Sequence, residues 1–334
     1  MRSFFRGILG ILVLGGICVG GWFFLADRPL HPGSRTFHLP AGTTMRAFAV
    51  MLKQHHVIDS ADSFVALAEL MGEGQALKSG VYRFPDPATP VRILHMVASG
   101  QVVEYPLTLV PGWTFRQVRQ ALVQAPHLQD NIKGLSHTAV RAALHMQGSL
   151  EGAFFPDTYY YTYDAPATSI LARARKRLQA LLRKDWRRRA PHLPIHTPEQ
   201  ALILASLVEK ETAKAGERRK IAGVFVNRLR LGMRLETDPT VIFSLGKRYR
   251  GVLTSADLAF RSPYNTYLHY GLPPTPIGLC SARALHAALH PDKTRALYFV
   301  ATGRGGNVFS DTLQAQDQEI RKYEIDTTRR PQVH

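Results

Sequence analysis

Glu209 is the residue of this sequence whose position best suits acid–base chemistry. It follows an apolar run, and at helical spacing it shares one face with Leu202, Ala205 and Ser206. The small side chains at positions 205 and 206 would leave room for another molecule to approach the carboxyl group. Burial on an apolar face raises the pKa of a carboxylic acid, as a general acid near neutral pH requires. The alternative, that Glu209 only ends the buried stripe and pairs with a basic residue, fits the helical phase equally well.

Two helices must position this carboxyl group. The first has a clear start, with Thr197 as N-cap, Pro198 at the first helical position and Gln200 completing a capping box. The second is expected over Glu217–Leu231 and ends at Gly232, a favourable residue just after a helix. The acid would therefore lie near the end of one helix, shortly before the next begins.

Two irregular segments follow these helices. Met233–Thr240 is expected to be a loop, with Asp238 as N-cap and Pro239 at the first position of a short helix. Ser262–Gly278 is too rich in Pro and Gly for regular structure, and such long loops often bind ligands. Ring stacking and amide hydrogen bonds, which suit N-acetyl sugars, would come from Tyr264, Asn265 and Tyr267.

The sequence resembles the YceG-like family, the endolytic murein transglycosylases. The resemblance rests on LASLVEKET (204–212), FVNRLRLGMRLETDPTV (225–241) and SPYNTYLHYGLPPTPIG (262–278), which occur in the family's order. Leu150–Tyr161 also matches the family pattern E-G-x-x-x-P-D-T-Y. The resemblance covers essentially the whole chain.

The resemblance implies that Glu209 is the acid/base of a lytic transglycosylase. Such an enzyme protonates the bond between N-acetylmuramic acid and N-acetylglucosamine, and the muramic acid's own C6 hydroxyl then closes a 1,6-anhydro ring. One carboxyl group suffices, and no cofactor or metal is expected. The resemblance also implies work on peptidoglycan glycan strands beside the peptidoglycan synthases. The groove residues expected from the motifs are Asp238, Thr240, Tyr264 and Asn265.

Two other classes of function stay open. In a non-catalytic peptidoglycan-binding or scaffold protein, Glu209 would be structural. In a water-using muramidase, a second carboxylate such as Glu236 or Asp238 would be needed, and Glu151 and Asp157 are further candidates. Glu211 lies about 200° round a regular helix from Glu209 and is not expected to share its site.

The N-terminus predicts a membrane location. Arg2 and Arg6 precede an uncharged run over residues 7–26, which is about the 20 residues that span a bilayer. The arginines place residues 1–6 in the cytoplasm and the chain from residue 27 onward outside the cytoplasmic (inner) membrane. A cleaved signal peptide is less well supported, because Phe24–Asp27 is a poor cleavage site. The formal net charge of +17 favours a polyanionic partner, and this location excludes nucleic acid as the main one.

The predicted fold class is α+β, with three parts in the exported region. After a linker over residues 27–33, residues 34–105 read as a βααβ unit, with strands at 36–39 and 80–84 and helices at 43–54 and 60–71. This unit resembles a LysM-like module, although a plain packing domain is the alternative. Residues 106–334 form the expected catalytic domain, which includes a strongly basic helix at 170–189 and a lone cysteine, Cys280.

Overall fold

The computed structural model describes residues 35–322 except 76, 213, 215 and 303–305. The predicted N-terminus, anchor and linker, residues 1–33, lie outside this range. Among the described residues, no helix combines the length and the apolar character needed to cross a bilayer. The chain divides into two compact units, the first ending its main segment at Tyr105 and also including Pro126–Leu128 and Tyr160–Ala165.

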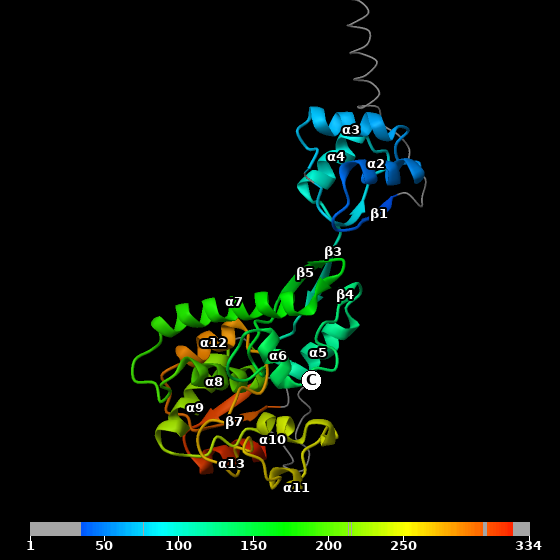
Figure 1. The fold of residues 1–334 in the computed structure, drawn as a ribbon. Helices are drawn as coiled ribbons and strands as arrows, with labels where there is room; N and C mark the ends of the chain where they lie inside the picture. The colour runs from blue at the N-terminus through cyan, green and yellow to red at the C-terminus, as the bar shows by residue number, and fades with distance from the viewer. Residues whose placement is uncertain (1–34, 76, 213, 215, 303–305, 323–334) are drawn as a thin grey trace, which may run out of the picture. The chain divides into compact units, whose positions relative to one another are not determined.

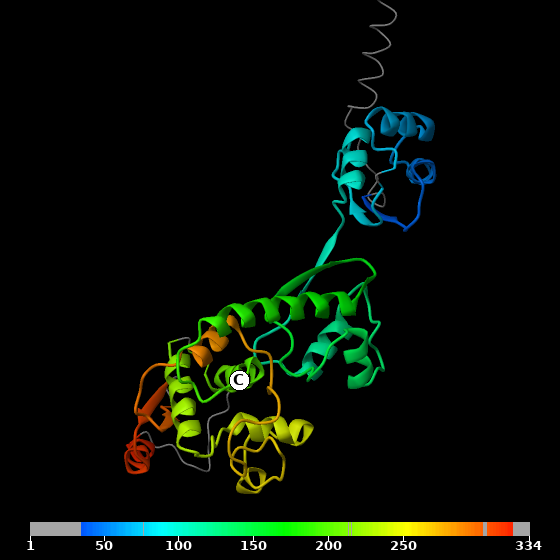
Figure 2. The same ribbon diagram turned by 60° about the vertical axis from the view of Figure 1, so that its left-hand side comes forward.

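The first unit is a small α+β fold (Figures 1 and 2). Its elements are β1 (Thr36–Leu39), α2 (Met45–Gln54), α3 (Ala61–Leu70), β2 (Gly80–Arg83) and α4 (Pro90–Ser99). β1 and β2 pair antiparallel with Phe37 opposite Tyr82. Phe48, Phe64 and Ile93 are buried in one core, so α4 belongs to the unit as well as α2 and α3. The predicted strand–helix–helix–strand order is confirmed, and the likeness to LysM stays a prediction.

The second unit holds the larger part of the chain. From Glu104 to Arg187 the elements are β3 (Glu104–Thr108), α5 (Phe115–Gln124), β4 (Leu128–Gln129), α6 (His137–Ala143), β5 (Thr158–Thr162), β6 (Ala165–Pro166) and α7 (Ala167–Arg187). The strands pair as β3 with β5 and β4 with β6. The division between the two units falls within each of these four strands.

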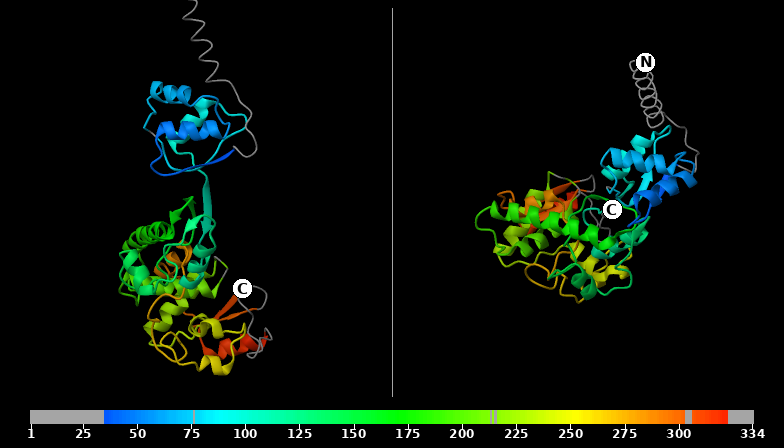
Figure 3. Two further views of the ribbon diagram at one scale, coloured as in Figure 1. Left: turned by 45° about the vertical axis from the view of Figure 1, so that its right-hand side comes forward. Right: turned by 45° about the horizontal axis from the view of Figure 1, so that its top comes forward.

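The remaining elements of the second unit run from α8 to α13. They are α8 (Pro198–Glu211), α9 (Arg218–Arg230), α10 (Asp238–Leu245), η2 (Gly246–Arg248), α11 (Ser255–Leu258), α12 (Ala282–Leu289), β7 (Tyr298–Ala301), β8 (Asn307–Ser310) and α13 (Leu313–Lys322). β7 and β8 form an antiparallel pair against which α13 packs (Figure 3).

Helix α8 is the centre of the second unit's core. It contacts α7, α9, α10 and α12, which lie around it in Figure 1. Its buried side chains include Leu204, Leu207 and Val208, and they pack with Phe225 of α9 and Leu285 of α12. Removing these apolar surfaces from water is the main force that fixes the direction of α8. The predicted capping box of Thr197 and Gln200 is confirmed at its first turn.

The predicted starts of α10 and of the basic helix are wrong by one and three residues. Asp238 is the first residue of α10, and Thr237 is the N-cap, so Asp238 does not cap this helix. The Thr237 side chain accepts no hydrogen bond from the first turn of α10, and its hydroxyl donates to Glu211. The basic helix begins at Ala167, ahead of the predicted Ile170, because the apolar face already starts there.

Candidate active site

Three helices hold the carboxylate of Glu209. The residue lies in the last turn of α8, and its side chain is only 6% exposed. Ser281, the N-cap of α12, donates its backbone N–H to Oε2 over 2.8 Å, and its hydroxyl donates to the same oxygen. Arg218, the first residue of α9, donates from Nη2 to Oε1 over 3.2 Å. The position of the acid is thus set by α8, α9 and α12 together.

The two oxygens of this carboxylate are not equivalent. A carboxylate oxygen offers two lone-pair directions. Ser281 occupies both directions on Oε2, whereas Arg218 takes one direction on Oε1. Among the described residues Arg218 is the one donor to Oε1, which keeps a direction from which a proton could be given and taken, while the two bonds from Ser281 orient the group through Oε2.

A second carboxyl group, that of Glu151, lies near the same helix end. Its Oε1 accepts the backbone N–H of Phe115, the first residue of α5, over 2.8 Å. Burial raises the pKa of Glu151 to about 7, against the lowering effects of that hydrogen bond and of the charges on Lys210 and Arg116. Glu151 is therefore uncharged in a large fraction of molecules at neutral pH.

Lys210 connects the two carboxyl groups electrostatically. Burial lowers its pKa, and the charges of Glu151 and Glu209 oppose that effect. Its side chain runs past Gly112, where an added Cβ would lie 3.8 Å from Cδ of Lys210. Lys210 was not expected to matter from the sequence, yet its charge interacts with those of both acids.

The proline-rich loop before α12 closes over α8. Ser206 is fully buried, accepts the backbone N–H of Ile277 over 3.1 Å and donates to Ile203 over 2.7 Å. The space expected beside Ala205 and Ser206 is therefore filled by this loop. Gly278 is required there, because a Cβ on it would lie 2.7 Å from the carbonyl oxygen of Gly112.

The four predicted groove residues differ in how far their side chains are buried. Asp238 and Tyr264 are half-buried: Asp238 accepts from the Tyr267 hydroxyl over 2.5 Å, and Tyr264 meets the hydroxyl of Thr275 at 2.9 Å. Thr240 and Asn265 are fully buried. The Asn265 amide donates to the carbonyls of Leu258 and Phe260 over 2.9 and 2.8 Å, which fixes the loop between α11 and the SPYNTY segment. Substrate contact stays a prediction for all four.

Asp157 and Glu236, which were considered as second carboxylates, and Glu211, which was not expected to share the site, have partners of their own. Asp157 is ion-paired with Arg177. Glu236 has a left-handed backbone at φ 52° and pairs with the buried Arg228 at 3.0 Å. Glu211 accepts from the hydroxyl of Thr237, at the start of α10.

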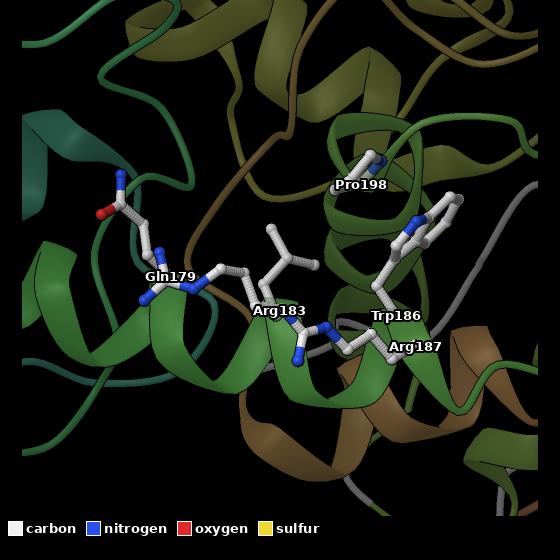
Figure 4. A pocket seen from close by; sticks show the side chains of 6 residues that line it. Gln179, Arg183, Trp186, Arg187 and Pro198 are labelled. Atoms are coloured by element: carbon white, nitrogen blue, oxygen red, sulfur yellow. The ribbon is translucent and has the colours of Figure 1, made fainter.

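The basic helix α7 carries its charge on the solvent side. Arg177 also lies 5.0 Å above the ring of Phe155, and Arg189, just after the helix, lies 4.2 Å above Trp186. A cavity of about 250 Å³ opens along α7, where Figure 4 shows Arg183, Trp186 and Arg187 with Pro198 of α8. None of its lining residues is a hydrogen-bond or ion-pair partner of Glu209 within the described part of the chain. Just after α7, Arg188 and Arg189 are also exposed, and the exposed basic side chains of the helix itself are those of Arg173, Lys176, Arg177, Arg183, Lys184 and Arg187.

Neither a thiol nor a metal cluster is part of the site as described. Cys280 is fully buried, and burial raises the pKa of its thiol to about 12, so it is not a nucleophile at neutral pH. Within the described ranges, no three His, Cys, Asp or Glu side chains converge as metal ligands would.

Sequence reasoning missed Arg218 and Ser281. Ser281 could have been found as an N-cap, since it precedes the apolar-periodic segment 282–289. Nothing local marks Arg218 among its basic neighbours Arg219 and Lys220. Its role follows only from the packing of α9 on α8.

Comparisons with known proteins agree on one family. A model described as the YceG-like family matches residues 37–322. A Bacillus subtilis protein named endolytic murein transglycosylase is 31% identical over 337 residues, covering 93% of this chain and 91% of its own length. A protein of the same name from Streptococcus pneumoniae serotype 2 is 33% identical over 372 residues, and the match covers 97% of this chain but 65% of that protein. The crystal structure of a YceG-like protein from Listeria monocytogenes has a TM-score of 0.54 and 28% identity, covering 85% of this chain and 97% of that one.

Proposed function

The chain belongs to the YceG-like family, and from this premise we propose that it is an endolytic peptidoglycan lytic transglycosylase with Glu209 as its acid/base. The observation that carries the proposal is the carboxylate of Glu209, buried and held by Arg218 on one oxygen and Ser281 on the other. A general acid must present its proton in a fixed direction, and this arrangement leaves one direction on Oε1 for it.

The proposed reaction needs no activated water. Glu209 gives its proton to the glycosidic oxygen between N-acetylmuramic acid and N-acetylglucosamine as that bond breaks. The carboxylate then takes the proton from the C6 hydroxyl of the muramic acid, and the C6 oxygen bonds to C1 to close the 1,6-anhydro ring. The protein ends the cycle in its starting protonation state. Arg218 stabilises the carboxylate that exists between the two transfers.

The proposed location follows from the predicted anchor at residues 7–26. The catalytic unit would stand on the outer side of the cytoplasmic membrane and cut within nascent strands, beside the peptidoglycan synthases. Asp238 and Tyr264 are proposed to border the groove. Thr240 and Asn265 are proposed to support it from below, since both are fully buried.

A water-using muramidase is the second candidate, and the observation that favours it concerns Glu151. Its pKa is raised to about 7, within the range useful to an acid or base, and it lies in electrostatic contact with Lys210 beside Glu209. In that reaction Glu151 would be the second carboxylate, in preference to Glu236 or Asp238.

Mass spectrometry of the products from uncrosslinked glycan strands tests the proposal. Anhydro-muramyl ends from the wild type that are absent from Glu209→Gln would support the transglycosylase and the role of Glu209. Reducing ends would favour the muramidase and make Glu151→Gln the next variant. If the folded wild type cleaves no strands, the result would favour a binding or scaffold protein.

A further inference from the structure

A second cavity of the catalytic unit, the arginine cavity, is lined largely by cationic side chains. Its volume is about 380 Å³, and its charged and polar lining consists of Arg218 and Arg219 from the start of α9, Arg283 and His286 from α12, and Asp185 from the last turns of α7. Since α12 packs on both α7 and α9, the three helices hold these side chains around one space. Three guanidinium groups face a single carboxylate there, so the lining is positively charged.

Arg218 lines this cavity with hydrogen-bond donors to spare. A guanidinium group carries five N–H groups, and in the described part of the chain that of Arg218 makes one hydrogen bond, from Nη2 to Oε1 of Glu209. Its Nε is buried without a partner. Unsatisfied buried donors are rare in native structures, and a bound ion is one partner that completes them. An anion in the cavity would lie against a cation that Glu209 only partly satisfies.

Arg283 and the start of its helix offer further donors. The Arg283 side chain is exposed, and no described residue pairs with it or accepts a hydrogen bond from it. The backbone N–H groups of Ala282 and Arg283, in the first turn of α12, also lack acceptors among the described residues, and such a helix end favours an anion. Arg219, by contrast, already donates to the His290 carbonyl over 2.9 Å and pairs with Asp292 at 3.0 Å.

Guanidinium groups and a helix N-terminus together complement an oxyanion, either a carboxylate or a phosphate. The position of the cavity favours a carboxylate of the strand, because Arg218 contacts Glu209 and also lines the cavity. A group held there lies within one side chain of the proposed acid, and the muramic acid at the cut bond carries the peptide stem. We propose that the arginine cavity binds a carboxylate of that stem. This inference rests on the proposed function for the identity of its ligand.

Calorimetric binding of a small stem analogue to the full wild-type chain, in uncharged detergent, tests the subsite apart from cleavage. N-acetylmuramyl-L-alanyl-D-glutamate and its diamide have one sugar and no glycosidic bond to cut, and they differ in carboxylates against uncharged amides. Hydrogen bonds from charged donors predict about tenfold tighter binding of the acid than of the diamide.

Two variants in the cavity should change this preference in opposite directions. Arg283→Gln should weaken binding of the acid about fivefold, because it removes an unpaired cation. Asp185→Asn should tighten it about threefold, because it removes the one negative charge of the lining. Arg183→Gln, at an exposed position on α7 outside this cavity, is the matched control and should leave it unchanged. Circular dichroism establishes that each variant is folded.

Equal affinities for the acid and the diamide would overturn the subsite, as would a preference that Arg283→Gln leaves unchanged. An equal loss in Arg183→Gln would show only a general attraction to the basic surface and would overturn it too. Arg283-dependent binding of inorganic phosphate, without a preference for the muramyl acid, would contradict the assignment to the stem. An Arg283-dependent preference in a protein that cleaves no strand would leave the subsite standing and defeat the proposed catalysis, whereas cleavage without any preference would do the reverse.

Discussion

Ser281 uses one hydroxyl group both to hold Glu209 and to begin α12. Its Oγ donates to Oε2 of Glu209 and accepts the backbone N–H of Ala284 over 3.2 Å. The carboxylate therefore lies at the N-terminus of α12, where the partial positive charge of the helix favours an anion. The start of a structural helix and the orientation of the acid depend on the same atom.

Replacing Ser281 with Ala should affect both properties. The loss of the cap should lower the free energy of unfolding by about 1 kcal/mol, and the loosened acid should lower kcat about tenfold. Ser136→Ala is the matched control. Ser136 caps α6 by accepting the backbone N–H of Ala139 over 3.2 Å, and its hydroxyl is not bonded to Glu209. Urea unfolding and strand-cleavage rates measure the two effects. Equal kcat values for the two variants would show that the hydroxyl has no part in positioning the acid.

The Glu209–Arg218 pair should show strong coupling in stability. Both side chains are largely buried, so removing either charge leaves the other uncompensated and should cost about 3 kcal/mol. The double variant Glu209→Gln/Arg218→Met should lose much less than the sum of the two single losses. The measurement is a double-mutant cycle by urea unfolding, with Lys322→Met, on the exposed end of α13, as a control cation. Additive losses would contradict a direct pair.

Glu151 should make stability depend on pH. Its pKa is raised from 4.5 to about 7 in the folded chain, so the wild type has its full stability below pH 4.5 and loses stability as the pH rises through about 7. Glu151→Gln cannot ionise, and relative to it the wild type should lose about 3 kcal/mol between pH 4 and pH 8.

Urea unfolding of both proteins across that range tests this expectation. Glu199→Gln provides the control, because Glu199 is exposed in the first turn of α8. A constant difference between the wild type and Glu151→Gln at all pH values would show that Glu151 ionises as freely in the folded chain as in the unfolded one.

Replacing Asn265 should affect the stability of the fold more directly than it affects substrate binding. It is fully buried, and its amide group donates to two carbonyls and accepts the N–H of Tyr267 over 2.9 Å. Asn265→Ala should therefore lower the free energy of unfolding by about 3 kcal/mol. Tyr264→Phe, which loses only the contact with Thr275, should cost about 1 kcal/mol or less. Thermal unfolding measures the stability of the two variants, and KM for glycan strands measures their substrate binding. A raised KM for Asn265→Ala without loss of stability would instead indicate that Asn265 contacts the strand directly.

What the sequence could predict was mostly local. The capping boxes of Thr197 with Gln200 and of Thr254 with Asp257 each depend on residues three apart, and both are present. The side chain of Thr237, the N-cap residue of α10, has a distant partner, since it donates to Glu211, 26 residues earlier. Side-chain choices that depend on such a contact leave no periodic signal in the sequence.

In the candidate site, too, the local features could be predicted from the sequence and the long-range contacts could not. Glu209 could be found from its place on an apolar helix face and from the LVEKET motif. Its donor Ser281 lies 72 residues further on, and the loop that fills the space beside Ser206 comes from Ile277, 71 residues away. The prediction of open space there was wrong because helical spacing says which residues share a face but not what covers that face.

The order in which these parts are made has a consequence for the growing chain. Residues 204–212, which contain the acid, leave the ribosome well before Ser281. A nascent or truncated chain that ends before Ser281 possesses Glu209 but neither of the two donors that orient its Oε2. In the proposed reaction, Glu209 therefore reaches its oriented form only after α12 has been synthesised and has docked on α8.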